Sequence, residues 1–362
     1  MMSGKIREAL RPARVLLLAL VAGVVATFPA DHGDARPKKP PVVTPPPPAP
    51  PPPPIQPATL NDRLIADAAA YQAYLQRVTA VSPAFVDGAG VAASLRVGSG
   101  YEPAALVRGA AAFGALAALR EPTFVAAIRA AGPTPQARYV LLNRLIAEPG
   151  YVFTFPGADR AALYAKQAIG IQGLRLMAVG QAVKQSAYDV QHSAWSKEMV
   201  VDPAGRLAAV KSAGAAAMSP APDVAATLKS ELVGAAPMGL PSGPTVTYET
   251  PLIAKAMALA AFAAAGEAGD AAYERLMYLT SERNTAYCLA EAKMNLNQCL
   301  AVAKPHYEDI FCLGQHAMID TGVCLARGGG GLMTISMRVQ PLKLKPPARV
   351  AEAGRHPARR HR

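Results

Sequence analysis

The sequence lacks the short motifs that identify several common classes of enzyme and cofactor-binding protein. It contains no GxSxG nucleophile elbow, no HExxH metalloprotease motif, no Walker phosphate loop and no CxxCH haem attachment site. We therefore predict no cofactor, no metal and no identifiable catalytic residue. Whether the protein is an enzyme stays open, with a non-enzymatic role favoured.

Patterns typical of β-strands are also scarce, whereas alanine-rich stretches with apolar residues three and four positions apart recur. Pro122 and Pro135 each fit the first turn of a helix. No repeat with a fixed period of about 34–45 residues is present. The sequence therefore predicts an all-α, multi-helical domain. Helices are expected near residues 60–78, 103–118, 123–131, 135–147, 158–183, 202–212, 223–233, 252–265, 270–279, 282–303 and 305–319.

Cysteine is absent from the first 287 residues, and all four cysteines lie within one stretch near the C-terminal end. Pro305 in this stretch fits the first turn of a helix but not the middle of one, so two helices should form an antiparallel hairpin around it. In such a hairpin, the residue numbers of any two facing residues add up to nearly the same value. The sum is 612 for Cys288 with Cys324 and 611 for Cys299 with Cys312. We therefore predict these two nested disulfides.

Helix geometry argues against the other two connectivities of four cysteines. The first two cysteines are eleven positions apart, which is about three turns along one face of a helix. Sequential or crossed pairing would have to span roughly 16 Å, beyond the ~7 Å limit between Cα atoms. The twelve positions from Cys312 to Cys324 leave an offset of ~120°, which a helix break at Gly314 or Gly322 would correct.

Two other interpretations of the cysteines stay open. Four reduced thiols could pack in a cytosolic core, although the N-terminal sequence argues for export. A zinc site would also use cysteines, but it prefers short C-x2–4-C spacings, which are absent. The layout is similar to that of twin CX9C helical hairpins. The spacers here are CX10C and CX11C, so no family is assigned.

Residues 1–30 have the pattern of a signal peptide or an N-terminal membrane anchor. Four basic residues precede an uncharged apolar run over 15–25, which is shorter than the ~20 residues of a membrane span. If the uncharged run is extended over 15–30, it could tether the chain to the inner membrane. Both alternatives make the protein periplasmic or otherwise exported, where disulfides persist.

Composition divides the remaining chain into five segments. Residues 31–57 form a proline-rich spacer that we expect to be disordered. A helical lobe over 58–212 and a second over 251–327, which contains the cysteine hairpin, flank a loop-rich connection over 213–250. Residues 328–362 form a Gly-rich and then basic tail, also expected to be disordered. Whether there is one lobe or two stays open.

The excess of positive charge lies at the two ends of the chain. Of the formal net charge of +12, the first forty residues contribute +4 and residues 338–362 contribute +7, which leaves +1 for the rest. The body of the chain is therefore not basic, and no nucleic-acid partner is expected. The tail could instead contact an anionic membrane surface through four arginines. These are Arg349, Arg355, Arg359 and Arg360.

A first candidate site lies within the predicted hairpin. His306, Asp309 and His316 recur there at helical spacing and would share a face. Side chains of these types can bind a divalent metal or act as an acid–base pair. The alternative is an ordinary polar face with acids favoured near a helix N-terminus.

A second candidate group contains Asp189, His192 and Trp195, the only tryptophan. Asp189 lies three positions before His192 and could orient its imidazole. The alternative is a capped helix end with a half-buried tryptophan as its anchor.

Together these features predict an exported cell-envelope protein that acts as a non-enzymatic binding or scaffold module. Its partner would be an envelope protein or polymer, and residues 82–100 and 213–251 are candidate binding loops. The alternative is an envelope hydrolase that acts on peptidoglycan or another polymer through an unrecognised carboxylate or histidine site. A deep cleft with converging acids would favour the hydrolase, and an exposed apolar groove would favour the binding module.

Export is directly testable. A fusion of residues 1–60 to alkaline phosphatase, which is active only outside the cytoplasm, should show phosphatase activity because the segment directs translocation. A fusion that is well expressed but inactive would contradict this prediction.

Overall fold

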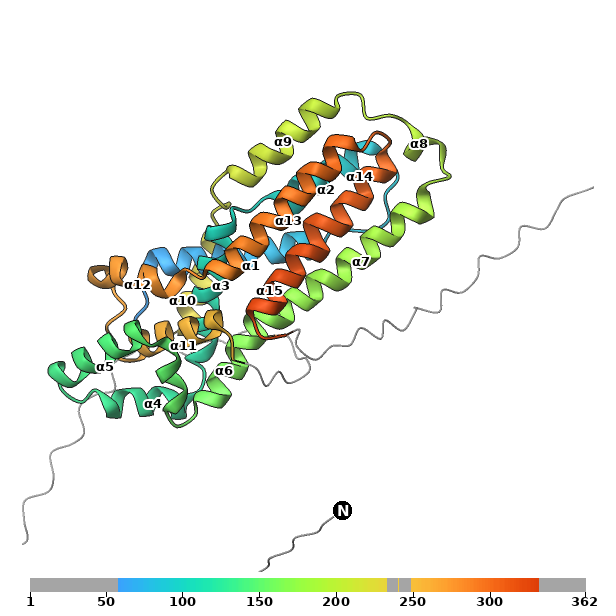
Figure 1. Cartoon of the computed structure of the whole chain (residues 1–362). Coiled ribbons are helices and arrows are strands. Elements are labelled where there is room, and N and C mark those ends of the chain that lie inside the picture. The colour runs from blue at the N-terminus through green and yellow to red at the C-terminus, as the bar shows by residue number, and fades with distance from the viewer. Residues whose placement is uncertain (1–57, 233–239, 241–248, 332–362) are drawn as a thin grey trace, which may run out of the picture. The chain divides into compact units, whose positions relative to one another are not determined.

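A computed structural model describes residues 58–232, 240 and 249–331. In these ranges the secondary structure is helical throughout, apart from one isolated β-bridge, so the all-α prediction is confirmed (Figure 1). The predicted signal or anchor over 1–30, the spacer over 31–57 and the basic arginines of the tail lie outside the described residues.

Three helices form the centre of the core: α1 (Asp62–Thr79), α3 (Pro103–Ala118) and α11 (Pro251–Ala264). Helix α3 contacts both of the others, and nearly all of α11 is buried. Small side chains allow the close approach. A Cβ atom added at Gly109 of α3 would lie 2.5 Å from a backbone oxygen of α1. Each of the three helices begins with a side-chain cap, as local sequence favours. The caps are Asn61, Glu102 and Thr250.

The remaining helices surround this centre and the cysteine hairpin. They are α2 (Gly88–Ser99), α4 (Pro122–Ala131), α5 (Pro135–Ala147), α6 (Ala158–Lys166), α8 (Ala194–Lys197), α9 (Pro203–Ala215), α10 (Pro222–Leu232) and α12 (Tyr273–Thr280), with 3-10 turns η1 (Pro149–Thr154) and η3 (Asp270–Ala272). Pro122 and Pro135 stand in the first turns of α4 and α5, as predicted.

The predicted hairpin and both of its disulfides are confirmed. Its first arm is α13 (Arg283–Val302), and its second arm runs through α14 (His306–Cys312), η4 (Leu313–Asp320) and α15 (Thr321–Gly328). The outer bridge joins Cys288 to Cys324 and the inner bridge joins Cys299 to Cys312, with Cα–Cα distances of 5.6 and 5.7 Å. No free cysteine remains.

The second arm corrects the offset between its cysteines in a way that the sequence did not predict. The helix does not break at Gly314 or Gly322. Instead, η4 is a π-helix, whose turns take up one residue more than α-helical turns. The twelve positions from Cys312 to Cys324 therefore complete the turns that eleven positions complete on the α-helical first arm. Both bridges then fit one register.

The glycines of the second arm pack against α7 (Gln172–Val190), which lies alongside it in Figure 1. A Cβ atom at Gly322 would lie 2.7 Å from the backbone oxygen of Gly173, and one at Gly180 would lie 2.8 Å from the backbone nitrogen of Ile319. The two helices thus approach backbone to backbone, and larger side chains would separate them.

Two expected segments differ in the structure. The candidate binding loop over 82–100 contains helix α2, which starts after Asp87 because the Asp87 carboxylate accepts a hydrogen bond from the Gly90 nitrogen. The expected helix over 158–183 is divided in the structure into α6, the short π-segment η2 (Gln167–Ile171) and α7.

Helices that precede residues 213–250 pack against helices that follow them. Helix α3 contacts both α11 and α13, and all three belong to one compact unit.

Within the described ranges, no single helix has both the length and the apolar composition of a membrane span. Only α3 and α4 taken together meet these criteria, and they are bent by 94°.

The two disulfides should differ in their contribution to stability. The outer bridge links positions 36 apart and the inner bridge positions 13 apart. Loop-closure entropy then gives about 4 kcal/mol for the outer bridge and about 3 kcal/mol for the inner one. Urea unfolding of the Cys288→Ala/Cys324→Ala protein should therefore show a free energy about 1 kcal/mol lower than that of Cys299→Ala/Cys312→Ala. A larger loss in the second variant would contradict this ranking.

Candidate functional site

The hairpin turn is held by a buried arginine from α9. The Arg206 guanidinium forms an ion pair with Asp309 at the start of α14, and it also donates hydrogen bonds to the backbone carbonyls of Leu300 and Ala303. The side chains of Arg206 and Asp309 are only 6% and 3% exposed. One cation therefore caps the end of α13 and fixes the start of the second arm.

Asp309 is consequently part of the structural framework. Burial raises the pKa of its carboxyl, while the hydrogen bond and charge of Arg206 act in the opposite direction. His306, predicted to share its face, packs its ring against Gly88 at the start of α2. His316 pairs elsewhere, with Asp320. The structure thus gives the three members of the first predicted cluster three different partners.

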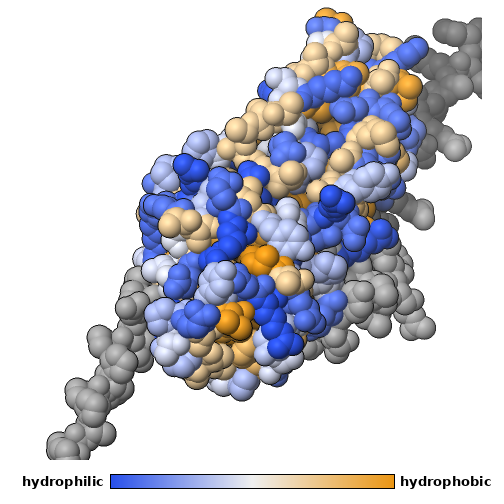
Figure 2. Space-filling view, turned by 60° about the vertical axis from the view of Figure 1, so that its left-hand side comes forward, coloured by the Kyte–Doolittle hydropathy of each residue, from blue (hydrophilic) through white to orange (hydrophobic). Residues whose placement is uncertain are grey.

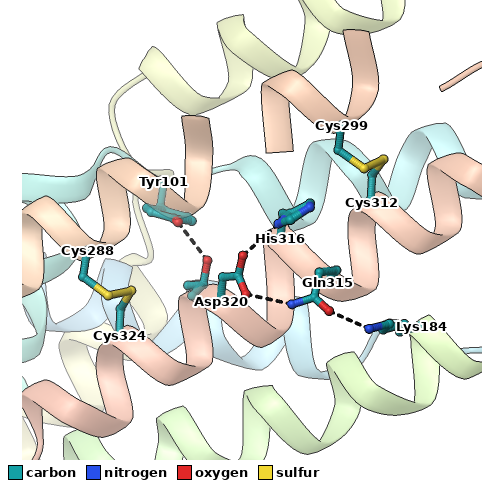
Figure 3. Close-up of polar contacts among 10 residues, drawn as sticks. Tyr101, Lys184, Cys288, Cys299, Cys312, Gln315, His316, Asp320 and Cys324 are labelled. Atoms are coloured by element: carbon teal, nitrogen blue, oxygen red, sulfur yellow. Dashed lines mark hydrogen bonds and ion pairs between the residues drawn. A yellow bond between two sulfur atoms is a disulfide. The ribbon is translucent and has the colours of Figure 1, made fainter. Parts of the chain in front are cut away.

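The π-helical segment carries a polar network (Figure 3). His316 Nδ1 lies 2.8 Å from an Asp320 oxygen. The other Asp320 oxygen accepts a hydrogen bond from Gln315, whose own oxygen accepts one from Lys184 of α7. Both His316 and Asp320 are partly exposed. When Nδ1–H donates this hydrogen bond to the Asp320 carboxylate, Nε2 is left as the basic nitrogen, which is the arrangement of an oriented general base.

Tyr101 fixes the end of this segment from the loop between α2 and α3. Its hydroxyl lies 2.8 Å from that of Thr321, and both residues are buried. Burial strongly raises the pKa of the Tyr101 hydroxyl, so it stays protonated. The contact ties the second arm of the hairpin to the start of α3.

The second predicted cluster has local structural contacts. Asp189 accepts a hydrogen bond from Gln185, one turn earlier on α7. His192 is exposed in the turn that follows, and Trp195 is half-buried against the core on the short helix α8. In the part of the chain that the structure describes, no group of three or more His, Cys, Asp or Glu side chains fits a metal ion.

An apolar groove of about 430 Å³ lies over the inner disulfide. Both cysteines of the Cys299–Cys312 bridge line it, together with Tyr188, Tyr307, Phe311 and Val302. Val302 is 75% exposed and Tyr188 is 48% exposed, although both are large and apolar. The disulfide therefore holds the two hairpin arms on either side of an exposed apolar surface.

Aromatic contacts give this groove a defined wall. The rings of Tyr188 and Phe311 meet edge to face with centroids 6.2 Å apart, and the Lys184 ammonium lies 4.9 Å from the Phe311 ring centre. The polar residues of the lining include Gln191 and Glu308. The Glu308 carboxylate accepts a hydrogen bond from the backbone nitrogen of Lys304.

A second groove of about 570 Å³ is lined by the outer bridge, Cys288–Cys324, and by Glu282 and Arg327. Thr250 and Gly328 also line it. The groove at the inner bridge is the stronger candidate for an apolar partner, because its lining includes the exposed side chains of Val302 and Tyr188.

Comparison with protein-family models, with curated proteins and with solved structures found no match for this chain.

Sequence reasoning missed the aromatic wall and the α7 residues that contact the hairpin. Tyr307 and Phe311 are four positions apart on the predicted second helix, so their shared face was readable from spacing. Lys184 and Tyr188 are more than 100 positions away from that face, and no local pattern joins them to it.

The Arg206–Asp309 ion pair should be strongly coupled. Arg206→Met and Asp309→Leu should each lower the unfolding free energy by about 3–5 kcal/mol, because each leaves a single buried charge. The double variant should lose clearly less than the sum of the two. The exposed Lys229–Asp62 pair is the matched control, and Lys229→Met should cost less than about 1 kcal/mol. Additive losses in urea unfolding of the Arg206 and Asp309 variants would contradict the coupling.

Proposed function

We propose that this protein is an exported binding module whose groove at the inner disulfide takes an apolar segment of an envelope partner protein. The observation that carries the proposal is the exposed aromatic and aliphatic lining of this groove, between arms joined covalently by Cys299–Cys312. The two disulfides are typical of a protein that folds in an oxidising, exported environment.

The chemistry of the groove favours a protein segment over a polymer of sugars. Its walls are mainly apolar, and its volume lies within the ~300–1,000 Å³ of ordinary binding pockets. Apolar and aromatic anchors of a partner would fill it, as at the centres of protein interfaces. Figure 2 shows that one face of the molecule is largely hydrophilic, with hydrophobic residues gathered in a few small patches.

An envelope hydrolase is the second candidate, and the His316–Asp320 pair favours it. Such a pair can provide a general base. Neither His316 nor Asp320 lines the grooves at the two disulfides. A peptidoglycan-degrading activity of the purified protein that His316→Gln abolishes would favour this candidate over the binding module.

The groove can be tested by photocrosslinking in intact cells. Benzoylphenylalanine in place of Val302 should give a crosslinked product with one partner protein, whereas the same group at Ala226, exposed on α10, should not. Tyr188→Glu in the Val302 reporter should reduce this product about fivefold or more, because it places a charge in the apolar wall.

Equal crosslinking from positions 302 and 226, or a product unaffected by Tyr188→Glu, would overturn the proposal. A product of twice the chain mass would assign the groove to a second copy of this protein instead of a partner.

A further inference from the structure

Lys293 of α13 has an unusual environment for a lysine. Its ammonium donates a 2.8 Å hydrogen bond to the backbone carbonyl of Ser99 and lies 4.4 Å from the centre of the Tyr101 ring. Gly214 of α9 faces the same nitrogen, and a Cβ atom at that position would collide with it. Helices α9 and α13 therefore pack with a space that fits the lysine end group.

The partners of this ammonium are a carbonyl and a ring, both uncharged. Two other half-buried cations of the described chain differ in this respect, because Arg206 is paired with Asp309 and Arg108 with Asp67. No ion pair of this kind joins Lys293 to a carboxylate within the described residues. Burial lowers its pKa to about 8, and the charge of Glu102, the cap of α3, opposes this shift only in part.

Lys293 also lies at the surface openings between α9 and α13. A small groove of about 150 Å³ is lined by Ser99, Gly214 and Lys293, so it contains the amine end of the side chain. A larger groove of about 490 Å³ adjoins it, since Lys211, Lys293 and Asn297 line both. A small molecule that extends from the larger groove into the smaller one would thus reach the amine.

We propose that Lys293 forms a Schiff base with a small carbonyl compound that carries a carboxylate, with Lys211 and Asn297 binding the carboxylate. The neutral amine attacks the carbonyl carbon, and the resulting carbinolamine loses water to give a C=N bond. The amine contributes two protons to that water and the carbonyl contributes its oxygen. No oxidant or reductant takes part.

The residues around the amine suit this chemistry. A lysine in a partly desolvated site is an effective nucleophile because more of it is unprotonated at neutral pH. Lys211 is exposed at the rim and supplies a positive charge, while Asn297 supplies an amide donor. The smaller groove, of about 150 Å³, has room only for a ligand with a compact carbonyl end. This site is separate from the groove over the inner disulfide and does not depend on the function proposed there.

The probe is glyoxylate, which combines an aldehyde with a carboxylate, in the presence of cyanoborohydride. The reductant adds hydride to the imine carbon and leaves a stable carboxymethyl-lysine that peptide mapping locates. Because burial lowers the pKa of Lys293 to about 8, a much larger fraction of this amine than of an ordinary lysine is unprotonated at pH 7.5. In the folded protein, Lys293 should therefore react at least tenfold faster than Lys211 or the exposed Lys229.

Two further measurements separate this site from a merely structural lysine. The rate of modification at Lys293 should rise with pH around a midpoint near 8, and Lys211→Met should lower the rate with glyoxylate severalfold while leaving the rate with uncharged acetaldehyde unchanged. Lys293→Arg, which retains the charge, should remove the fast-reacting site. Modification of Lys293 no faster than that of exposed lysines, or equal effects of Lys211→Met on both aldehydes, would overturn the proposal.

Discussion

The register of the cysteine hairpin is the constraint on which the rest of the structure depends. Two disulfides fix the facing positions of the two arms, although the arms space their cysteines by eleven and twelve residues. The π-helical turns of η4 remove the difference of one residue. The same segment contains Gln315, His316 and Asp320, so the widened turns also assemble the polar network. Gly314 within this segment and Gly322 just after it allow α7 to pack closely against the second arm, and α7 supplies Tyr188 of the aromatic wall of the groove.

The chain uses two buried cations of the hairpin region in opposite ways. Arg206 is paired with Asp309 and donates a hydrogen bond to the Ala303 carbonyl, which fixes α9 to the hairpin turn. Lys293, further along the same α9–α13 contact, has only uncharged partners and adjoins open grooves. Desolvation without a counter-charge favours the neutral form of an amine, whereas a paired guanidinium stays charged. The α9–α13 interface therefore contains an arginine that stabilises the fold and, at a separate position, the lysine that we propose to be reactive.

The sequence was informative where the determining contacts are local or periodic. Proline and capping residues marked the helix starts, and index sums in an antiparallel hairpin were enough to pair the cysteines. It failed where distant segments meet. The partner of Asp309 is an arginine 103 positions earlier, a contact that no local pattern indicates. Gly314 and Gly322 suggested a helix break, yet their role is close packing against α7, which only the tertiary structure defines.

The most direct test of this account uses two variants, each of which shortens one arm of the hairpin by one residue. Deletion of Gln315 gives the second arm the eleven-residue spacing of the first, so an ordinary α-helix would then fit both bridges. Peptide mapping without reduction should find Cys288–Cys324 and Cys299–Cys312 intact in that variant. Deletion of Met294, exposed on α13, should leave scrambled or free thiols, because it increases the mismatch. Native pairing after the Met294 deletion, together with scrambling after the Gln315 deletion, would contradict the claim that the π-helix sets the register.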